Sequence, residues 1–424
     1  MKNVSSTERE IIPRNVMVLT LSRVFWSTSD SSIDSYLPLF MTAMGASPSI
    51  IGLITALGSF GAMLLYPVGG YIADKSGRVK LVAYSTLLYV SSFIIYLLAP
   101  NWQWVAVASI YQSMVLFYLP AMNAIMADSI PVNERGRLYA FNFALPNLVR
   151  ILSPYIGGLF IAQFELIPAM RIGFIISFVI GLIVAGMRLL YLNETITQIE
   201  KISWNPLKLF PAAYKDMFES LKWVERNIRS YAVLSILMAF LSSMILTFWP
   251  IYAVRHLGIK EYLFGAILLW SGVARAVLSF FIGEIVDRIG SRKCFLIGFM
   301  TAIPSMYVFT LAKGFWMALP IYTLIVISSV FIWISSQVYL ANSIPRRNRG
   351  RVMASLGSGM MIGVSGIGFP SGFLIFLPRI FGSLMGGIIY DLDPVLPWII
   401  QTIFLVFGLV YTYFMVHDPV EAYE

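Results

Sequence analysis

Residues 70–80 read GYIADKSGRVK, and residues 283–293 read GEIVDRIGSRK. Both stretches follow the pattern G-x-x-x-D-[RK]-x-G-x-x-[RK], and each separates two long apolar runs. Glycine allows a tight turn, and charged side chains favour water over an apolar interior. The equivalent aspartates, Asp74 and Asp287, are 213 positions apart (287 − 74). The sequence therefore predicts one polar turn that occurs twice in a duplicated chain.

A second pair of similar segments supports the duplication. The letters ADSIP at 127–131 return as ANSIP at 341–345, at an offset of 214 (341 − 127), and RGR follows both segments. Internal repeats of this length are expected of membrane proteins built from two parallel halves. We therefore predict a first half over 1–192, a second half over 229–424, and a cytoplasmic linker over 193–228 that contains an amphipathic helix.

The composition predicts a membrane protein. The chain is 58% apolar and 12% charged, with a mean hydropathy of +0.79, unlike a soluble globular protein. Apolar runs of about 18 residues or more can cross the hydrocarbon core as helices. We predict an all-α integral membrane fold with twelve transmembrane helices in two pseudo-symmetric six-helix halves. The predicted spans are 16–40, 48–73, 80–99, 102–127, 137–163, 168–192, 229–256, 260–286, 294–312, 315–342, 351–390 and 395–416.

The net charge of +9 indicates topology rather than a nucleic-acid partner. Of the 30 Lys and Arg residues, 22 fall in the termini and even-numbered loops, four in odd-numbered loops and four inside apolar runs. Positive residues are enriched on the cytoplasmic side of membranes. We therefore predict a multi-pass plasma-membrane protein with both termini cytoplasmic and an uncleaved first helix. We expect it to be a monomer in the lipid bilayer, with no cofactor and no metal.

The repeated turn, at this position in each half, resembles the signature loop of the major facilitator superfamily, and the resemblance covers nearly the whole chain. It implies that Asp74 holds the two halves together through the start of helix 11 in the outward-facing state, and that Arg78 pairs with Asp128 at the end of helix 4. In the second half, Ser291 replaces the arginine and Asn342 the acid, so both partners of that pair are absent. The implied cytoplasmic gate comprises Gly70, Asp74, Arg78, Asp128, Asp287 and Arg288.

Two helices depart from a simple repeat. Helix 5 carries Ser153-Pro154-Tyr155-Ile156-Gly157-Gly158, which resembles the antiporter-type pattern Gly-Pro-x-x-Gly-Gly with serine in the first place. Helix 11 carries roughly fifteen extra residues that are rich in glycine and proline. Forty helical residues would be roughly 60 Å long. We therefore expect either a break or re-entrant bend in helix 11, or an extracellular extension.

Apart from Glu261 and Glu284 at the two ends of span 260–286, the only acids inside the predicted spans are Asp30 and Asp34, both in helix 1. Ionisable groups at this depth are costly, and by default they are functional. With Arg23 they are spaced by seven and four residues, so all three share one helical face. Two carboxylates one turn apart in an apolar medium do not both ionise easily, which suits proton coupling. The alternative is a structural ion pair between Arg23 and Asp30.

Arginines near the middle of two other spans suggest a shared cavity. Arg150 lies near the middle of helix 5 and Arg275 near the middle of helix 8. In the superfamily that the turn resembles, these two helices face each other across the two halves. Arg379 follows Pro378 in the irregular part of helix 11, so we expect it at the membrane interface. The predicted substrate cavity comprises Arg23, Trp26, Asn123, Arg150, Arg275, Trp333 and Gln337.

The resemblance implies secondary active transport of a small organic solute by alternating access, which we expect to be proton-coupled through Asp30 and Asp34. The helix 5 fragment favours efflux of drug-like compounds. Uptake or export of a small organic anion, attracted by Arg150 and Arg275, is the alternative. A non-transporting membrane solute sensor stays open, although such sensors generally carry longer cytoplasmic extensions. An integral-membrane enzyme is disfavoured, because the sequence has only His256 and His417 and no nucleophile or phosphate-loop motif.

Overall fold

The computed structural model describes residues 12–131, 134–196, 200, 205–345, 352, 356–357, 359–364 and 372–418. Within these described residues, the first part of the chain forms nine helical segments joined by short loops. They are α1 (Arg14–Asp34), α2 (Leu37–Ala43), α3 (Pro48–Lys75), α4 (Val79–Leu98), α5 (Trp102–Val115), η1 (Leu116–Tyr118), α6 (Leu119–Ser129), α7 (Arg135–Phe164) and α8 (Leu166–Tyr191).

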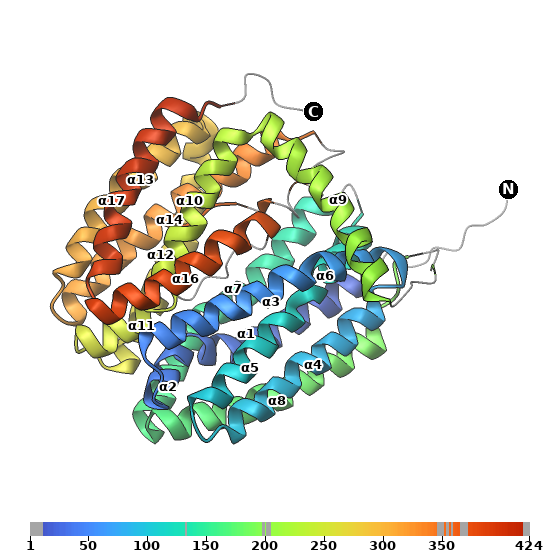
Figure 1. Ribbon diagram of the computed structural model, residues 1–424, viewed down its shortest axis with the longest axis horizontal. Helices are drawn as coiled ribbons and strands as arrows, with labels where there is room; N and C mark the ends of the chain where they lie inside the picture. The colour runs from blue at the N-terminus through green and yellow to red at the C-terminus, as the bar shows by residue number, and fades with distance from the viewer. Residues whose placement is uncertain are drawn as a thin grey trace.

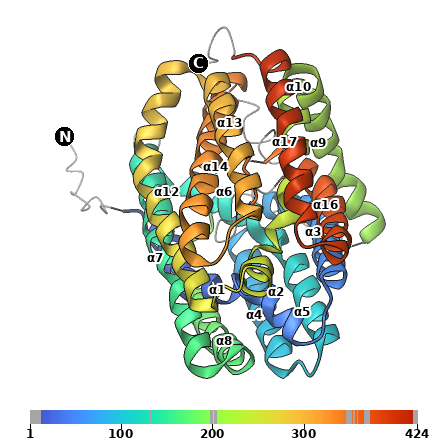
Figure 2. The same cartoon turned by 90° about the vertical axis from the view of Figure 1, so that its left-hand side faces the viewer.

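The helix α9 (Pro206–Asn227) connects this part to a second series of helices. These are α10 (Arg229–Leu246), α11 (Trp249–Ile251), η3 (Tyr252–His256), α12 (Glu261–Ile289), α13 (Ser291–Thr310), α14 (Phe315–Ser343), α16 (Phe373–Leu392) and α17 (Leu396–Met415). Figures 1 and 2 show the two series as two bundles that lie side by side, with α9 running along one end of both.

Among the described residues, eleven helical stretches are long and apolar enough to cross a membrane. They match eleven of the twelve predicted spans. The first predicted span, 16–40, corresponds to α1 and α2, where charged and hydroxyl side chains lower the hydropathy. The prediction of an all-helical, multi-span fold is confirmed.

The first helix of each bundle is interrupted at an equivalent place. In the first bundle α1 ends at Asp34, and α2 begins one turn later with Pro38 in its first turn. In the second, α10 ends at Leu246, and α11 carries Pro250 in its first turn. Proline has no N–H for the helix ladder, so it favours the start of a new helical segment over the interior of a long one.

Two seams of glycines join the bundles. A Cβ on Gly52 of α3 would lie 2.5 Å from the Ser383 carbonyl of α16, and a Cβ on Gly387 would lie equally close to the Pro48 carbonyl. In the other seam, a Cβ on Gly265 of α12 would lie 2.7 Å from the Pro154 carbonyl of α7. All these positions lie in the halves of their helices away from the repeated turns. We call that end the opposite side, and the end with the turns the signature side.

The eleventh predicted span, 351–390, is not one helix. Its helix α16 begins only at Phe373, and the described residues 359–364 are non-helical. The Met361 carbonyl accepts from Ser242 Oγ (2.6 Å), the Ile362 carbonyl from Ser329 Oγ (3.2 Å) and the Gly363 carbonyl from Trp249 Nε1 (2.8 Å).

The ends of this irregular stretch come together. A Cβ on Gly372 would lie 2.2 Å from the Gly357 nitrogen, so Gly357 and Gly372 lie side by side although fifteen positions separate them in sequence (372 − 357). Of the two expectations for this segment, the described residues therefore support the re-entrant break. Non-helical backbone at this depth is tolerated because its polar groups are bonded inside the protein.

Candidate functional site

A cavity of about 630 Å³ lies between the two bundles. Most of its wall comes from α1, α3, α4, α5, α7 and α8 of the first bundle. The second bundle adds Phe376 and Arg379 from α16 and the interrupted segment with Thr247 and Pro250. Both helix interruptions therefore reach the cavity, as expected of a binding site built at a discontinuous pair of repeat-related helices.

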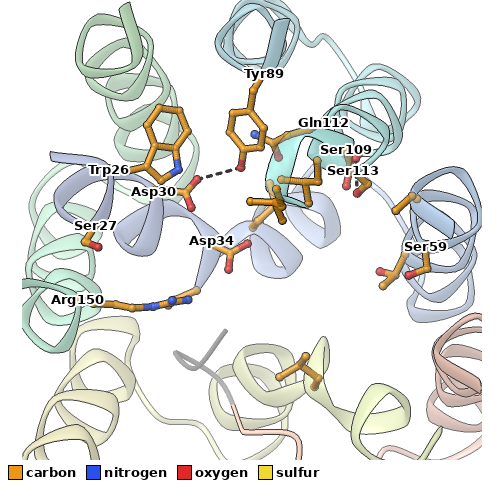
Figure 3. A pocket seen from close by; sticks show the side chains of 18 of the residues that line it. Trp26, Ser27, Asp30, Asp34, Ser59, Tyr89, Ser109, Gln112, Ser113 and Arg150 are labelled. Carbon is orange, nitrogen blue, oxygen red and sulfur yellow. Dashed lines mark hydrogen bonds between the residues drawn. The ribbon is translucent and has the colours of Figure 1, made fainter. Parts of the chain in front are cut away.

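The two acids of α1 point into this cavity (Figure 3). Tyr89 of α4 donates a hydrogen bond to Asp30 Oδ1 (3.4 Å), and the Trp26 ring packs edge-on against Tyr89 with 5.1 Å between centroids. Asp34 lies one turn further along α1 and is exposed to the cavity. Thus one carboxylate is held by aromatic neighbours, while the other is open to a solute or to water.

Arginines reach these acids from both bundles. Figure 3 shows the Arg150 side chain extending from α7 toward the two carboxylates, and it interacts electrostatically with both. Its Nε atom is buried without a hydrogen-bond partner. Arg379 of α16 interacts with Asp34 from the other bundle. The expectation that Arg379 is interfacial is wrong, because α16 is already helical at Pro378 and carries Arg379 into the cavity wall.

Two further arginines line another part of the cavity. Arg23 donates to Asn142 Oδ1 (3.2 Å), and the ion pairs of the described residues include none between Arg23 and Asp30. Arg188 near the end of α8 donates to Thr86 Oγ1 (2.7 Å) and Met122 Sδ (3.6 Å), and its guanidinium lies over the Tyr118 ring. Arg188 is one of the basic residues that the sequence assigns to cytoplasmic ends, yet it is only 4% exposed.

The other predicted cavity residues lie elsewhere. Arg275 of α12 is close enough to Arg150 for their charges to repel, but it is not part of the described cavity wall. Trp333 and Gln337 of α14 pack against the non-helical segment, each 3.3 Å from the position of a Cβ on Gly359. Asn123 of α6 is exposed outside this wall. The structure thus brings Arg23, Trp26, Asp30, Asp34 and Arg150 together.

The first repeated turn is organised around Arg78. This side chain pairs with Asp128 at the end of α6, lies 3.7 Å from Asp74, and donates to Thr195 Oγ1 (2.9 Å). Glu194 accepts from the backbone N–H groups of Arg78 and Val79 at the start of α4. Asp74 itself is mostly exposed, and its implied partner, the start of helix 11, lies outside the described residues.

Two glycines in α3 near this turn have different roles. A Cβ on Gly69 would lie 1.8 Å from the Phe117 carbonyl, whereas one on Gly70 would make only ordinary contact with Pro120. The close approach of α3 to η1 therefore depends on Gly69, although the sequence pattern singles out Gly70.

The second turn is held differently. Arg288 pairs with Glu284 within α12, and the Asp287 next to it has no resolved ion pair among the described residues. Asp418, beyond α17, accepts from the Arg292 backbone N–H (3.0 Å) at the start of α13. Glu194 and Asp418 thus have equivalent capping roles in the two bundles. The sequence patterns did not reveal these roles. Each acid follows the last helix of its bundle and satisfies free N–H groups at a helix start.

The Major Facilitator Superfamily model matches residues 19–223 and 231–423, which is nearly all of the chain. The chain belongs to the Major Facilitator Superfamily. It is 24% identical over 404 residues to Multidrug resistance protein 2 of Bacillus subtilis, covering 93% of this chain and 94% of that protein. A shorter stretch of 123 residues is 25% identical to Quinolone resistance protein NorA of Staphylococcus aureus, covering 29% of this chain and 32% of that protein.

Solved structures show the same fold. The nucleoside transporter NupG, solved as a point mutant, superposes with a TM-score of 0.69 at 12% identity and covers 95% of this chain and 100% of that chain. Membership of the Major Facilitator Superfamily makes this chain a multi-pass membrane transporter of small molecules and not an enzyme. The cavity between the bundles is therefore the natural candidate for the transported solute.

Asp128→Asn is expected to lower the free energy of unfolding of this superfamily member by about 1 kcal/mol. The Arg78 side chain is only 12% exposed. Its guanidinium group would therefore lose the charge of its main partner, and water could not replace that interaction. Thermal unfolding in detergent measures the effect. The matched control is Glu134→Gln, which breaks the more exposed pair with Arg137 and should cost no more than about 0.5 kcal/mol. Equal effects of the two substitutions would contradict a structural role for the Arg78 pair.

Proposed function

We propose that this chain is a secondary active transporter that carries a small organic solute by alternating access, coupled to protons through Asp30 and Asp34. The main support is the cavity between the bundles, in which two carboxylates meet Arg150 and Arg379 from opposite sides. A proton or a solute that binds one of these groups changes the balance among the others. In an apolar setting such a change favours a different arrangement of the two bundles.

The glycine seams support the idea that the described conformation is closed at the opposite side. The cavity extends toward the signature side along α7 as far as Asn142 and Phe143. We propose that the signature side faces the cytoplasm and that the protein acts as a monomer in the plasma membrane, since the repeated turns and α9 carry the excess of basic residues. The described conformation would then be the inward-facing one.

Efflux of drug-like compounds is the direction and substrate class that we favour. The support is the Pro154-x-x-Gly157-Gly158 fragment of α7, which packs closely on α1 and α12, together with the similarity to proteins named for multidrug and quinolone resistance. Transport of a small organic anion is the second candidate. It is favoured by the part of the cavity wall that the structure describes, which carries four arginines (Arg23, Arg150, Arg188 and Arg379) but only two acids.

Proteoliposomes that contain the purified protein and a pH-sensitive dye test this proposal. A panel of cationic, neutral and anionic aromatic compounds is added with and without an imposed pH gradient. We expect at least one compound to be carried against its own gradient, and its movement to collapse the pH gradient. Binding of compounds without any flux would instead indicate a solute sensor. A solute flux whose rate is the same with and without the pH gradient would contradict proton coupling.

A further inference from the structure

The charged groups of the cavity fall into two sets. Arg150 and Arg379 interact with Asp30 and Asp34, so this set contains two positive and two negative groups. Arg23 and Arg188 form the second set. Their partners among the described residues are neutral: Asn142 for Arg23, and Thr86, Met122 and the Tyr118 ring for Arg188. Two positive charges are therefore not matched by acids in the cavity wall.

Arg23 interacts unfavourably with Arg188, and both line the same cavity. Arg188 is only 4% exposed, and its Nε atom is buried without a hydrogen-bond partner. Taking like charges out of water without a counter-charge is costly, and a buried donor without a partner adds to that cost. An anion placed between the two guanidinium groups would offset both terms.

We propose that Arg23 and Arg188 form a subsite for a doubly charged oxyanion, such as the phosphate group of an aromatic phosphate monoester. This subsite rests on the second candidate of the proposed function, transport of a small organic anion, and names the charged group of that anion. Guanidinium groups bind oxyanions through parallel N–H bonds, which a single lysine cannot reproduce. The Asn142 side-chain carbonyl orients the Arg23 guanidinium, and the Thr86 hydroxyl orients that of Arg188. The neighbouring Trp26 and Tyr118 offer aromatic surface for the ring of the phosphate ester.

Binding of phenyl phosphate to the purified protein in detergent tests the subsite by calorimetry. Benzenesulfonate and benzamide serve as singly charged and neutral probes of similar shape. We expect phenyl phosphate to bind at least tenfold more tightly than benzenesulfonate, and benzamide not to bind measurably. Arg23→Gln should weaken phenyl phosphate at least tenfold, and Arg23→Lys should recover only part of that loss. Arg137→Gln replaces an exposed arginine that does not line the cavity, and it should leave the affinity unchanged.

Arg188→Gln is expected to weaken phenyl phosphate as strongly as Arg23→Gln. If this variant does not fold, Thr86→Val keeps both arginines. It removes the bond that orients Arg188, together with the bond from Thr86 to the Val82 carbonyl within α4, and should weaken binding severalfold. Unchanged affinity in Arg23→Gln, or equal affinity for all three probes, would overturn the subsite. This binding experiment and the flux experiment can fail independently. Phenyl phosphate can bind through Arg23 in a protein that shows no proton-coupled flux, and proton-coupled flux of another solute can occur without this subsite.

Discussion

Asp34→Asn is expected to reduce proton-driven transport in proteoliposomes by more than about tenfold, toward the leak of empty liposomes. Asp34 is exposed to the cavity and interacts with Arg150 of one bundle and Arg379 of the other. An amide keeps the shape of the side chain but can neither release a proton nor attract these arginines. Coupling should therefore fail, while a solute held by other residues can still bind.

Asp30→Asn should have a smaller effect on binding but a similar effect on coupling, since Asp30 already receives a hydrogen bond from Tyr89. Asp393→Asn is the matched control, because Asp393 is exposed just beyond α16 and does not line the cavity. Flux is followed with a pH-sensitive dye, and binding is measured separately by calorimetry. Full coupling in both cavity variants would remove Asp30 and Asp34 from the proton pathway.

Gly265→Leu is expected to prevent closure at the opposite side and to abolish transport. A Cβ at this position would already lie 2.7 Å from the Pro154 carbonyl and 2.9 Å from the Tyr155 Cα, both backbone atoms that cannot move aside alone. Close packing of this kind tolerates only small residues. A leucine would force α12 away from α7, and the population should shift to a form that is open at the opposite side.

Labelling with a membrane-impermeant maleimide measures this shift. The reporter is Thr247→Cys at the cavity wall, in a background where the buried Cys294 is replaced by serine. Reagent added at the opposite side should label the Gly265→Leu protein faster than its parent. Gly186→Leu is the control, because a Cβ on that glycine meets nothing within 4 Å. Unchanged labelling together with intact transport would show that the seam does not control access.

Much of the fold and part of the site follow from local sequence. The spans are predictable because hydrocarbon imposes length and apolarity on every crossing helix. Asp30 and Asp34 are recognisable as cavity residues because every other acid lies outside the spans or within three residues of a span end. The Arg78–Asp128 pair follows from the family turn, since both partners sit at fixed places in the repeat.

The remaining site residues depend on tertiary packing. Arg188 lies in the last turn of α8. At such a position the sequence cannot distinguish an exposed arginine at a cytoplasmic helix end from one whose side chain points into the cavity. Sequence misplaces Arg379 because Pro378 resembles the end of an irregular stretch, whereas the helix α16 passes through it. The capping roles of Glu194 and Asp418 join residues more than one hundred positions apart, beyond the reach of a local pattern.

The non-helical segment at 359–364 has a consequence for how this chain can diverge. Its carbonyls are bonded by Ser242, Ser329 and Trp249, which belong to other helices. Replacing one of these donors by an apolar residue would leave a buried carbonyl of the second bundle without its hydrogen-bond donor. An uninterrupted helix at this place would satisfy its carbonyls within its own hydrogen-bond ladder and would be free of that constraint. The three donors and the length of the eleventh span should therefore change together during evolution.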